Sequence, residues 1–304
     1  PLCAAETGEK YALLIGVSKY DRTQLNSLRF PERDVTRLGD VLVSNAGFPK
    51  RNVRLLTRAN AFKTRNEKWM PTAKVIRREL RLLAQRAEKD DTVIIAFAGH
   101  GVQFTGEKEN YFCPADADLS KKESMIGLEG EVYQMLDKQC KARVKLLFVD
   151  ACRNDPRSKI NRTTRRVDLQ KLNNPQALEL PKGIAAFFSC KRGQEAFEDG
   201  DLKHGIFFHF VIEGLRGKAA SGGKVTLSGL KEYVKRRVID FVDEKLDQVQ
   251  IPDLRESSTD VIILAQQQGE IEETFTWKGR KRTRRVLRLD LGKGVTLDLV
   301  RIKK

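Results

Sequence analysis

The segment Thr92–Gly101 reads TVIIAFAGHG. A short, continuous apolar run of this kind is typical of a strand that is covered on both faces of a sheet. The segment Val144–Asn154, VKLLFVDACRN, has the same character. In both segments, small and polar residues follow the apolar run at once. We therefore predict two buried strands whose carboxyl ends carry His100 and Cys152.

Apolar runs elsewhere predict further strands, and apolar residues at three- and four-residue spacing predict helices. The predicted strands are Tyr11–Val17, Arg51–Thr57, Thr92–Ala98, Val144–Val149, Ile184–Ser189 and a shorter Val261–Leu264. The predicted helices are Pro31–Ser44, a helix that starts at Thr72, Glu129–Lys138, His204–Leu215 and Ser228–Val242. This alternation indicates an α/β fold with a mostly parallel sheet of about six strands flanked by helices.

The composition is that of a globular protein, with 304 residues, 40% hydrophobic and 32% charged, and it excludes a chain that is disordered throughout. No apolar run is long enough for a transmembrane helix. The net charge of +16 favours acidic partners or polyanions. Five cysteines without CxxC spacing argue against a disulfide framework and a structural zinc site. Unpaired thiols favour a reducing compartment, so we expect a cytoplasmic protein.

The predicted strand ends bring a thiol and an imidazole to one edge of the sheet if the two strands are neighbours. A thiol is a weak nucleophile at neutral pH, and a nearby imidazole can take its proton or stabilise its thiolate. The glycines beside His100 permit close backbone approach, and their N–H groups can face a developing oxyanion. The other two histidines lie in the predicted late helix: we expect His209 in the core and His204 to cap the helix or lie on the surface.

The order and spacing of several motifs resemble those of the caspase-like cysteine peptidases, and most closely their metacaspase and bacterial caspase-homologue branch. The motifs are YALLIGVSKY (11–20), LRFPERDV (28–35), IIAFAGHG (94–101), YFCPADA (111–117), LLFVDACRN (146–154), FFSCKRGQEAFED (187–199) and HGIFFHFVIEGL (204–215). His100 precedes Cys152 by 52 residues, near the spacing of roughly 50 typical of caspases. The nucleophile motif is Asp-Ala-Cys-Arg-Asn, which resembles the metacaspase variant rather than the caspase signature.

The resemblance implies a caspase-like three-layer fold and a Cys-His dyad. Cys152 would attack the scissile carbonyl and form a thioester, and His100 would protonate the leaving amine and then help to activate water. The backbone N–H groups of Gly101 and Cys152 would form the oxyanion hole.

The resemblance also implies the specificity. Metacaspases cleave after arginine or lysine, and Asp34 and Asp150 occupy the positions of the acidic residues that bind the basic side chain. Ser189 matches the wall of the same pocket. Two partly desolvated carboxylates would bind a guanidinium and repel an aspartate. We therefore expect polypeptide substrates with basic residues, and by resemblance to metacaspases a monomeric enzyme.

Many metacaspases need calcium, and this chain matches their acidic cluster only in part. Asp116 matches one ligand position and Glu129 another, but Gly130 and Lys159 stand where further acids would be. Calcium needs several oxygen ligands with negative charge. We therefore predict no metal site and no cofactor.

The extent of the resemblance sets the bounds of a peptidase domain, and composition and pattern set apart a connection inside it and the C-terminal residues. We predict an N-terminal extension (1–10), a peptidase domain (11–264), a flexible connection inside it (about 155–182) and a basic C-terminal appendage with a β-hairpin (265–304). A protease that cleaves after basic residues could cut its own connection, and the candidate sites are Arg162, Arg165, Arg166, Lys171 and Lys182.

Two other functions are compatible with these residues. The first is a catalytically silent caspase-like scaffold, which the presence of both His100 and Cys152 disfavours. The second is nucleic-acid binding through GRKRTRR (279–285) and the net charge. The appendage has no recognisable nucleic-acid module, so we favour the peptidase.

Overall fold

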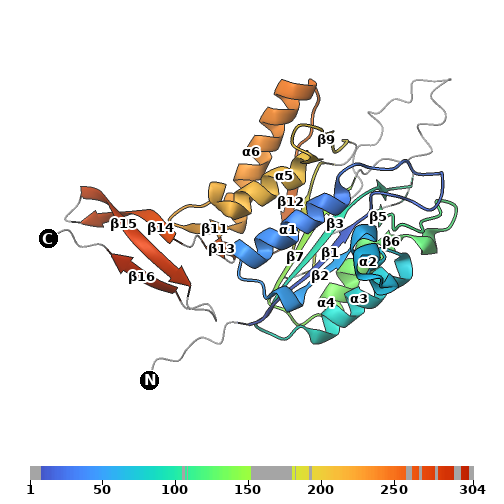
Figure 1. The fold of residues 1–304 in the computed structure, drawn as a ribbon, viewed down its shortest axis with the longest axis horizontal. Coiled ribbons are helices and arrows are strands. Elements are labelled where there is room, and N and C mark those ends of the chain that lie inside the picture. The colour runs from blue at the N-terminus through green and yellow to red at the C-terminus, as the bar shows by residue number, and fades with distance from the viewer. Residues whose placement is uncertain are drawn as a thin grey trace.

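A computed structural model of the chain describes residues 8–104, 107, 109–151, 180–181, 183–191, 194–257, 262–266, 269–277, 280–290 and 296–300. Its centre is a six-stranded sheet in the order β12-β8-β7-β3-β1-β2 (Figure 1). The strands are β1 (Lys10–Gly16), β2 (Val53–Leu56), β3 (Thr92–Ala98), β7 (Val144–Asp150), β8 (Ile184–Phe188) and β12 (Asp253–Glu256). The first five strands are parallel and β12 is antiparallel. The predicted fold class is confirmed.

Helices cover both faces of this sheet, which makes three layers (Figure 1). One face packs against α1 (Pro31–Asn45), α5 (Ile206–Glu213) and α6 (Leu227–Leu246). The other face packs against α3 (Ala73–Arg86), the π-helix η4 (Leu128–Tyr133) and α4 (Gln134–Lys138). The remaining described helices are η1 (Lys50–Asn52), α2 (Arg58–Thr64), η2 (Glu67–Trp69), η3 (Lys122–Ser124) and the π-helix η7 (Gly214–Lys218).

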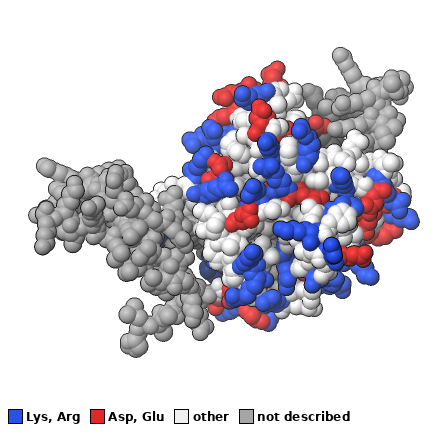
Figure 2. Space-filling view, in the orientation of Figure 1, with Lys and Arg blue, Asp and Glu red and all other residues white. Residues whose placement is uncertain are grey.

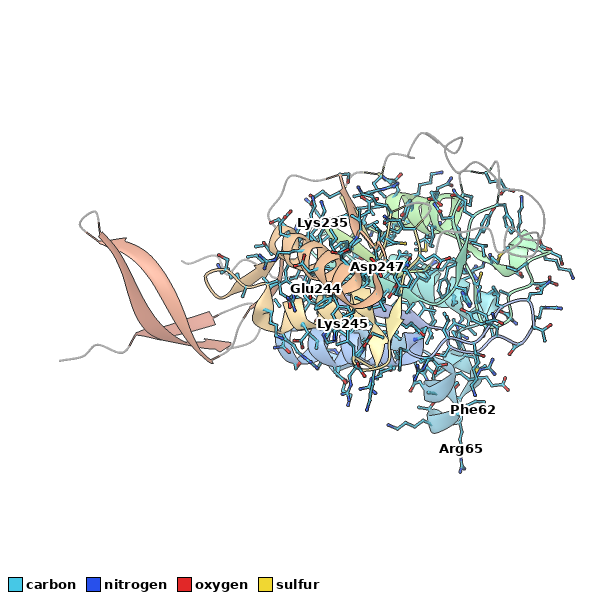
Figure 3. The ribbon with its side chains drawn as sticks, turned by 90° about the horizontal axis from the view of Figure 1, so that it is seen from above. Phe62, Arg65, Lys235, Glu244, Lys245 and Asp247 are labelled. Atoms are coloured by element: carbon cyan, nitrogen blue, oxygen red, sulfur yellow. The ribbon has the colours of Figure 1, made fainter. Side chains whose placement is uncertain are left out.

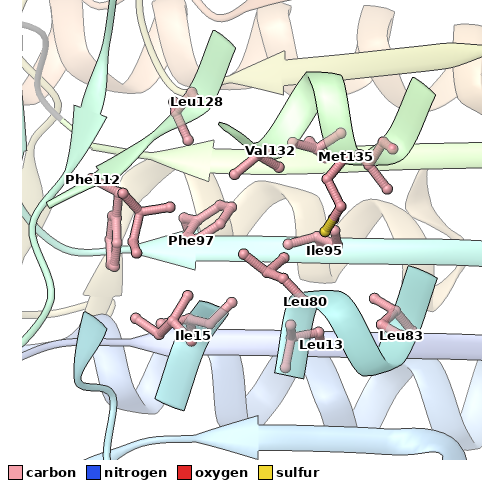
Figure 4. Close-up of a cluster of buried hydrophobic side chains, with 14 of the residues drawn as sticks. Leu13, Ile15, Leu80, Leu83, Ile95, Phe97, Phe112, Leu128, Val132 and Met135 are labelled. Atoms are coloured by element: carbon pink, nitrogen blue, oxygen red, sulfur yellow. The ribbon is translucent and has the colours of Figure 1, made fainter. Parts of the chain in front are cut away.

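The hydrophobic core has two parts, one on each face of the sheet, because successive side chains of a strand point to opposite faces. On β1, Leu13 and Ile15 face the layer that contains α3, where they belong to one buried cluster with Leu80 (Figure 4). Leu14 faces the opposite layer and belongs to a cluster with Leu38 of α1. Each fully buried aliphatic side chain stabilises the fold by about 1.5–3 kcal/mol. The central strands are therefore held from both sides.

Two sequence predictions about the C-terminal part of the domain are wrong. The late helix begins at Ile206 rather than His204, because His204 and Gly205 form the short strand β10 (His204–Gly205), which pairs with β9 (Glu198–Asp199). The predicted last strand, Val261–Leu264, is β13 (Ile263–Gln266), which pairs with β11 (Lys224–Thr226) outside the central sheet. The sixth central strand is β12, whose sequence DLRE has no apolar run that would reveal it.

The C-terminal residues form an antiparallel sheet of their own. It comprises β14 (Gly269–Trp277), β15 (Arg280–Asp290) and β16 (Thr296–Val300). β15 pairs with β16 in antiparallel fashion, with Val286–Asp290 opposite Thr296–Val300, inside the appendage for which we predict a β-hairpin. A second small sheet, near the carboxyl ends of the central strands, contains β4 (Gly101–Val102), β5 (Tyr111–Phe112) and β6 (Ile126–Gly127).

Positive and negative side chains are mixed on the face of the molecule that Figure 2 shows. Figure 2 shows lysines and arginines interspersed with acidic residues over the face that carries α1. On α6, the side chains of Lys235, Glu244 and Lys245 are each exposed (Figure 3), so both signs of charge occur on this helix. Phe62 of α2 is 69% exposed (Figure 3). Among the described residues, no helix combines the length and the apolar character that crossing a membrane requires.

Candidate active site

The strands that precede His100 and Cys152 are neighbours in the sheet. β3 and β7 pair in parallel, and the last residue of β3, Ala98, lies opposite the last residue of β7, Asp150. One residue further, the Gly99 N–H donates to the Asp150 carbonyl at 3.1 Å. His100 and Cys152 each follow these paired residues by two positions. Cys152 itself lies outside the described residues.

Gly99 turns the chain out of β3 and needs to be glycine. Its φ of +154° is one that other residues rarely adopt. A Cβ at this position would lie 3.0 Å from the Tyr20 hydroxyl oxygen and 3.2 Å from the Phe112 ring. The absence of a side chain therefore lets the backbone at His100 approach Tyr20.

The position and tautomer of His100 are set by its neighbours. Its backbone N–H donates to Tyr20 Oη at 2.7 Å, and the two rings lie 5.1 Å apart. Its Nε2 lies 2.8 Å from the carbonyl oxygen of Asn26. Since a carbonyl can only accept a hydrogen bond, Nε2 carries the proton and the lone pair of the neutral ring is on Nδ1. Nδ1 is then the atom that can act as a base.

Asp34 is buried in the first turn of α1, where its side chain is only 2% exposed. Its Oδ2 accepts the Gly205 N–H at 3.0 Å, and its Oδ1 lies 2.6 Å from His204 Nδ1. Burial raises the pKa of Asp34 well above its ordinary value, and the negative charge of Glu198 adds to the rise, while the Gly205 N–H opposes it.

Asp150 lies beside Asp34 at the end of β7. A Cβ on Gly205 would be 2.8 Å from Asp150 Oδ2 and 3.0 Å from Asp34 Oδ2. The two carboxyl oxygens therefore lie close to the same point beside Gly205. Burial and the charge of Asp34 raise the pKa of Asp150 to about 7, and the Ser189 hydroxyl opposes the rise. We call Asp34 and Asp150 the carboxylate pair. Such a pair attracts a cation strongly, because neutralisation relieves the repulsion between the two groups.

Ser189 is fully buried directly after β8, the next strand beyond β7. Its N–H donates to the Val149 carbonyl at 2.9 Å, and its carbonyl accepts the Gln250 side chain at 2.9 Å. The structure thus brings Asp34, Asp150 and Ser189, which are far apart in the sequence, to the same end of the sheet as His100.

Gly101, the residue predicted to contribute an oxyanion-hole N–H, is held by the small sheet that follows β3. It pairs with Phe112 in β4 and β5, and the Cys113 N–H donates to the His100 carbonyl at 2.9 Å. The backbone on both sides of His100 is therefore ordered by hydrogen bonds.

The comparison with known families agrees with this arrangement. The family model described as "Caspase domain" matches residues 9–262. The chain belongs to this family. The match covers the six central strands and both layers of helices.

The individual relatives share little sequence identity with this caspase domain. Metacaspase-1A of Aspergillus oryzae is 26% identical over 153 residues, which is 49% of this chain and 35% of that protein. Metacaspase-3 of Arabidopsis thaliana is 28% identical over 153 residues, which is 48% of this chain and 40% of that protein. The matches thus span less than half the length of either relative. The crystal structure of caspase-1 from Spodoptera frugiperda has the same fold, with a TM-score of 0.58 at 16% identity over 88% of this chain and 93% of that one.

The acidic residues at the positions that match the calcium ligands of many metacaspases accept hydrogen bonds from other groups of this protein. Asp116 accepts the Ala73 N–H at the start of α3. Glu129 accepts both the backbone and side-chain N–H groups of Asn110. The Gly130 N–H donates to Glu109. No cluster of three or more metal-binding side chains occurs among the described residues, and Lys159 lies outside them. The absence of a calcium site stays a prediction.

Other sequence predictions fall outside the described part of this caspase domain. They are the proposed self-cleavage sites Arg162, Arg165, Arg166, Lys171 and Lys182. The three described cysteines, Cys113, Cys140 and Cys190, are all buried. Burial raises the pKa of Cys113 to about 12 and also raises that of Cys140. Because the thiolate is the reactive form, these two thiols are unsuited to act as nucleophiles.

Sequence analysis missed three residues of the site. His204 was expected to cap a helix or lie on the surface, but it binds Asp34. Gly205 lies against both members of the carboxylate pair. Glu198 accepts the Arg29 and Phe30 N–H groups just before α1. The sequence carried one signal for His204 and Gly205. They form a His-Gly dipeptide directly before the apolar residues of α5, so a side-chain donor stands next to a residue without a side chain.

Proposed function

We propose that this protein is a cysteine endopeptidase that cleaves polypeptides after arginine or lysine, with Cys152 as nucleophile and His100 as acid and base. The observation that carries the proposal is the pairing of β3 with β7, in which Ala98 lies opposite Asp150. Two neighbouring strands that end in register place the residues just after them at one edge of the sheet. Membership of the caspase domain family supports the same chemistry.

In the proposed reaction, His100 Nδ1 takes the thiol proton and the Cys152 sulfur attacks the scissile carbonyl carbon. A C–S bond forms, and the carbonyl oxygen becomes an oxyanion that the N–H groups of Gly101 and Cys152 stabilise. The C–N bond then breaks as His100 returns the proton to the leaving amine. Water attacks the resulting thioester while His100 accepts its proton, and this step releases a carboxylic acid and restores the thiol.

The carboxylate pair supports the proposed preference for basic residues. Asp34 is buried and Asp150 is half-buried, and the pKa of each carboxyl group is raised, that of Asp150 to about 7, so the pair disfavours two negative charges at neutral pH. A guanidinium or ammonium group between them removes the repulsion. An aspartate side chain would instead add a further negative charge in the same low-dielectric place, so the pair discriminates by attraction and by repulsion.

The proposal is tested with peptides that differ only in the residue before the scissile bond, which we call the cleavage residue. Wild-type protein and Cys152→Ala are compared on arginine, lysine, aspartate, glutamine and leucine at this position, with calcium and with a chelator. We expect kcat/KM at least about 100-fold higher for arginine and lysine than for aspartate, and no turnover by Cys152→Ala. Preference for aspartate would overturn the specificity, and turnover by Cys152→Ala would overturn the mechanism.

Replacing Gly205 by alanine is expected to lower kcat/KM on arginine peptides by about 10- to 100-fold. The backbone of Gly205, with φ of −61° and ψ of 133°, is one that alanine adopts freely, so the loss comes from the new Cβ. That atom would press on the carboxyl oxygens of both Asp34 and Asp150. Steady-state kinetics on the peptide panel measure the effect.

Gly200→Ala is the matched control for this substitution. A Cβ at Gly200 meets only one nitrogen of the Arg29 side chain, at an ordinary contact distance of 3.6 Å. We expect its kinetics to equal those of the wild type. Equal losses in both variants would mean that a general disturbance of the β9–β10 segment, rather than contact with the carboxylate pair, causes the loss.

A further inference from the structure

His204 is the part of the site that neither the sequence nor the proposed reaction assigns. It lies on β10, which forms a short hairpin with β9 in which His204 is opposite Asp199 and Gly205 is opposite Glu198. The Asp199 side chain accepts the N–H groups of Asp201 and Leu202, which fixes the turn of this hairpin. The hairpin therefore presents its side chains in a defined geometry.

Hydrogen bonds connect this hairpin to the start of α1 at two places. Glu198 accepts the backbone N–H groups of Arg29 at 3.1 Å and Phe30 at 3.0 Å. On Asp34, Oδ1 contacts His204 Nδ1 and Oδ2 contacts the Gly205 N–H. The two oxygens of Asp34 thus each have one partner from the hairpin. Since a carboxylate oxygen has two lone pairs, each keeps one lone pair for a substrate.

We propose that His204 is a positioning residue for substrate recognition, and that its Nδ1–H fixes the carboxylate of Asp34 in the orientation that a basic side chain needs. This inference rests on the proposed function. Asp34 is ionised when it binds a cation, and the partner nitrogen of His204 must then carry the proton. The hydrogen bond consequently favours the ionised carboxylate and limits its rotation.

The surroundings of His204 keep its ring neutral, so that it acts as a hydrogen-bond donor and not as a competing cation. Burial, together with the positive charges of Arg33, Arg37 and Arg216, lowers its pKa to about 4 against the opposing charge of Glu213. The ring of His209 lies 5.9 Å away on α5, and burial lowers its pKa as well. A protonated imidazole would itself neutralise Asp34 and weaken its attraction for a substrate cation.

Variants of His204 separate positioning from a purely structural role. His204→Leu removes the donor, whereas in His204→Asn the amide nitrogen takes the place of Nδ1. His204→Gln moves the amide one carbon further out and serves as a second test if the leucine variant does not fold. The matched control is His209→Leu, since His209 is the neighbouring half-buried histidine and has no described hydrogen bond to Asp34.

We expect His204→Leu and His204→Gln to lower kcat/KM on arginine peptides by about 10- to 100-fold, mainly through KM, and His204→Asn to retain it within about threefold. Residual cleavage at non-basic residues should be unchanged, as should all kinetics of His209→Leu. Equal losses in the leucine and asparagine variants, or a loss that is the same at every cleavage residue, would overturn the proposal.

Binding of agmatine, a small guanidinium ligand, to the Cys152→Ala protein gives a readout that needs no catalysis. Calorimetry should show binding that weakens about 10-fold or more when His204→Leu is added, and that recovers with His204→Asn. If the wild type cleaves after basic residues and His204→Leu changes nothing, only the role of His204 is wrong. If the wild type neither binds agmatine nor cleaves after basic residues, the proposed function itself is wrong.

Discussion

His100→Ala is expected to lower kcat on arginine peptides by about 1,000-fold, within the range of general acid–base catalysis. The Asn26 carbonyl assigns the ring proton to Nε2, so Nδ1 is the base that the proposed reaction uses. Alanine removes both the acceptor for the thiol proton and the donor for the leaving amine. Single-turnover kinetics with a chromogenic arginine peptide measure the loss of the acylation step.

A second measurement distinguishes a catalytic loss from a folding defect. Alkylation of Cys152 by iodoacetamide at pH 7 should slow in His100→Ala, because less of the thiol is ionised. The buried Cys113, with its pKa of about 12, should remain unmodified in both proteins, as peptide mass spectrometry can verify. His209→Ala is the histidine control. A kcat within threefold of the wild type for His100→Ala would contradict the assignment.

Asp150→Asn is expected to abolish the preference for basic residues and at the same time to stabilise the free protein. The loss of kcat/KM on arginine peptides should reach about 100-fold or more, since one partner of a buried charged interaction is removed. The stabilisation arises because desolvation and the negative charge of Asp34 disfavour the ionised form of Asp150 in the folded protein. Activity and stability thus change in opposite directions, which a loss of folding would not produce.

The pH dependence of the stability gain follows from the raised pKa. Asp150 has a pKa of about 7 in the folded protein and an ordinary value of 3.8, so the folded state binds more protons between these limits. The free energy of unfolding of the wild type therefore falls as pH rises from about 4 to 7, and asparagine removes this fall. We expect an advantage for the variant of about 2 to 4 kcal/mol at pH 8 that shrinks towards pH 4. Denaturant titration at both pH values measures it.

Asp40→Asn provides the control for this experiment. Asp40 lies on α1 like Asp34, but its side chain is 59% exposed and pairs with Arg37 on the surface. Such surface pairs contribute little to stability. Its replacement should change neither selectivity nor the pH profile of unfolding. A destabilised Asp150→Asn protein at pH 8, or one that retains arginine preference, would contradict the account of the carboxylate pair.

Much of the framework was predictable because local chemistry determined it. The apolar runs at Thr92–Ala98 and Val144–Asp150 are strands in the structure, and the threonine predicted to start a helix, Thr72, caps α3 by accepting the Val75 N–H. Strand β12 was not predictable in this way, since three of its four residues are charged and it pairs with β8 at the edge of the sheet. β10 was assigned to the following helix because it is only two residues long and directly precedes the apolar residues of α5.

The sequence alone established the family resemblance, the alternation of strands and helices, and the choice of His100 and Cys152, because apolar periodicity and motif order are local properties that survive in the linear chain. The resemblance named Asp34 and Asp150 together, but only the tertiary structure decided how closely these acids meet and which groups contact them. Asp34, Asp150 and Gly205 lie on α1, β7 and β10, and burial beside one another raises the pKa values of both acids. The same packing turned His204 from an expected surface residue into a partner of Asp34. Electrostatic coupling depends on distance and dielectric, and folding sets both.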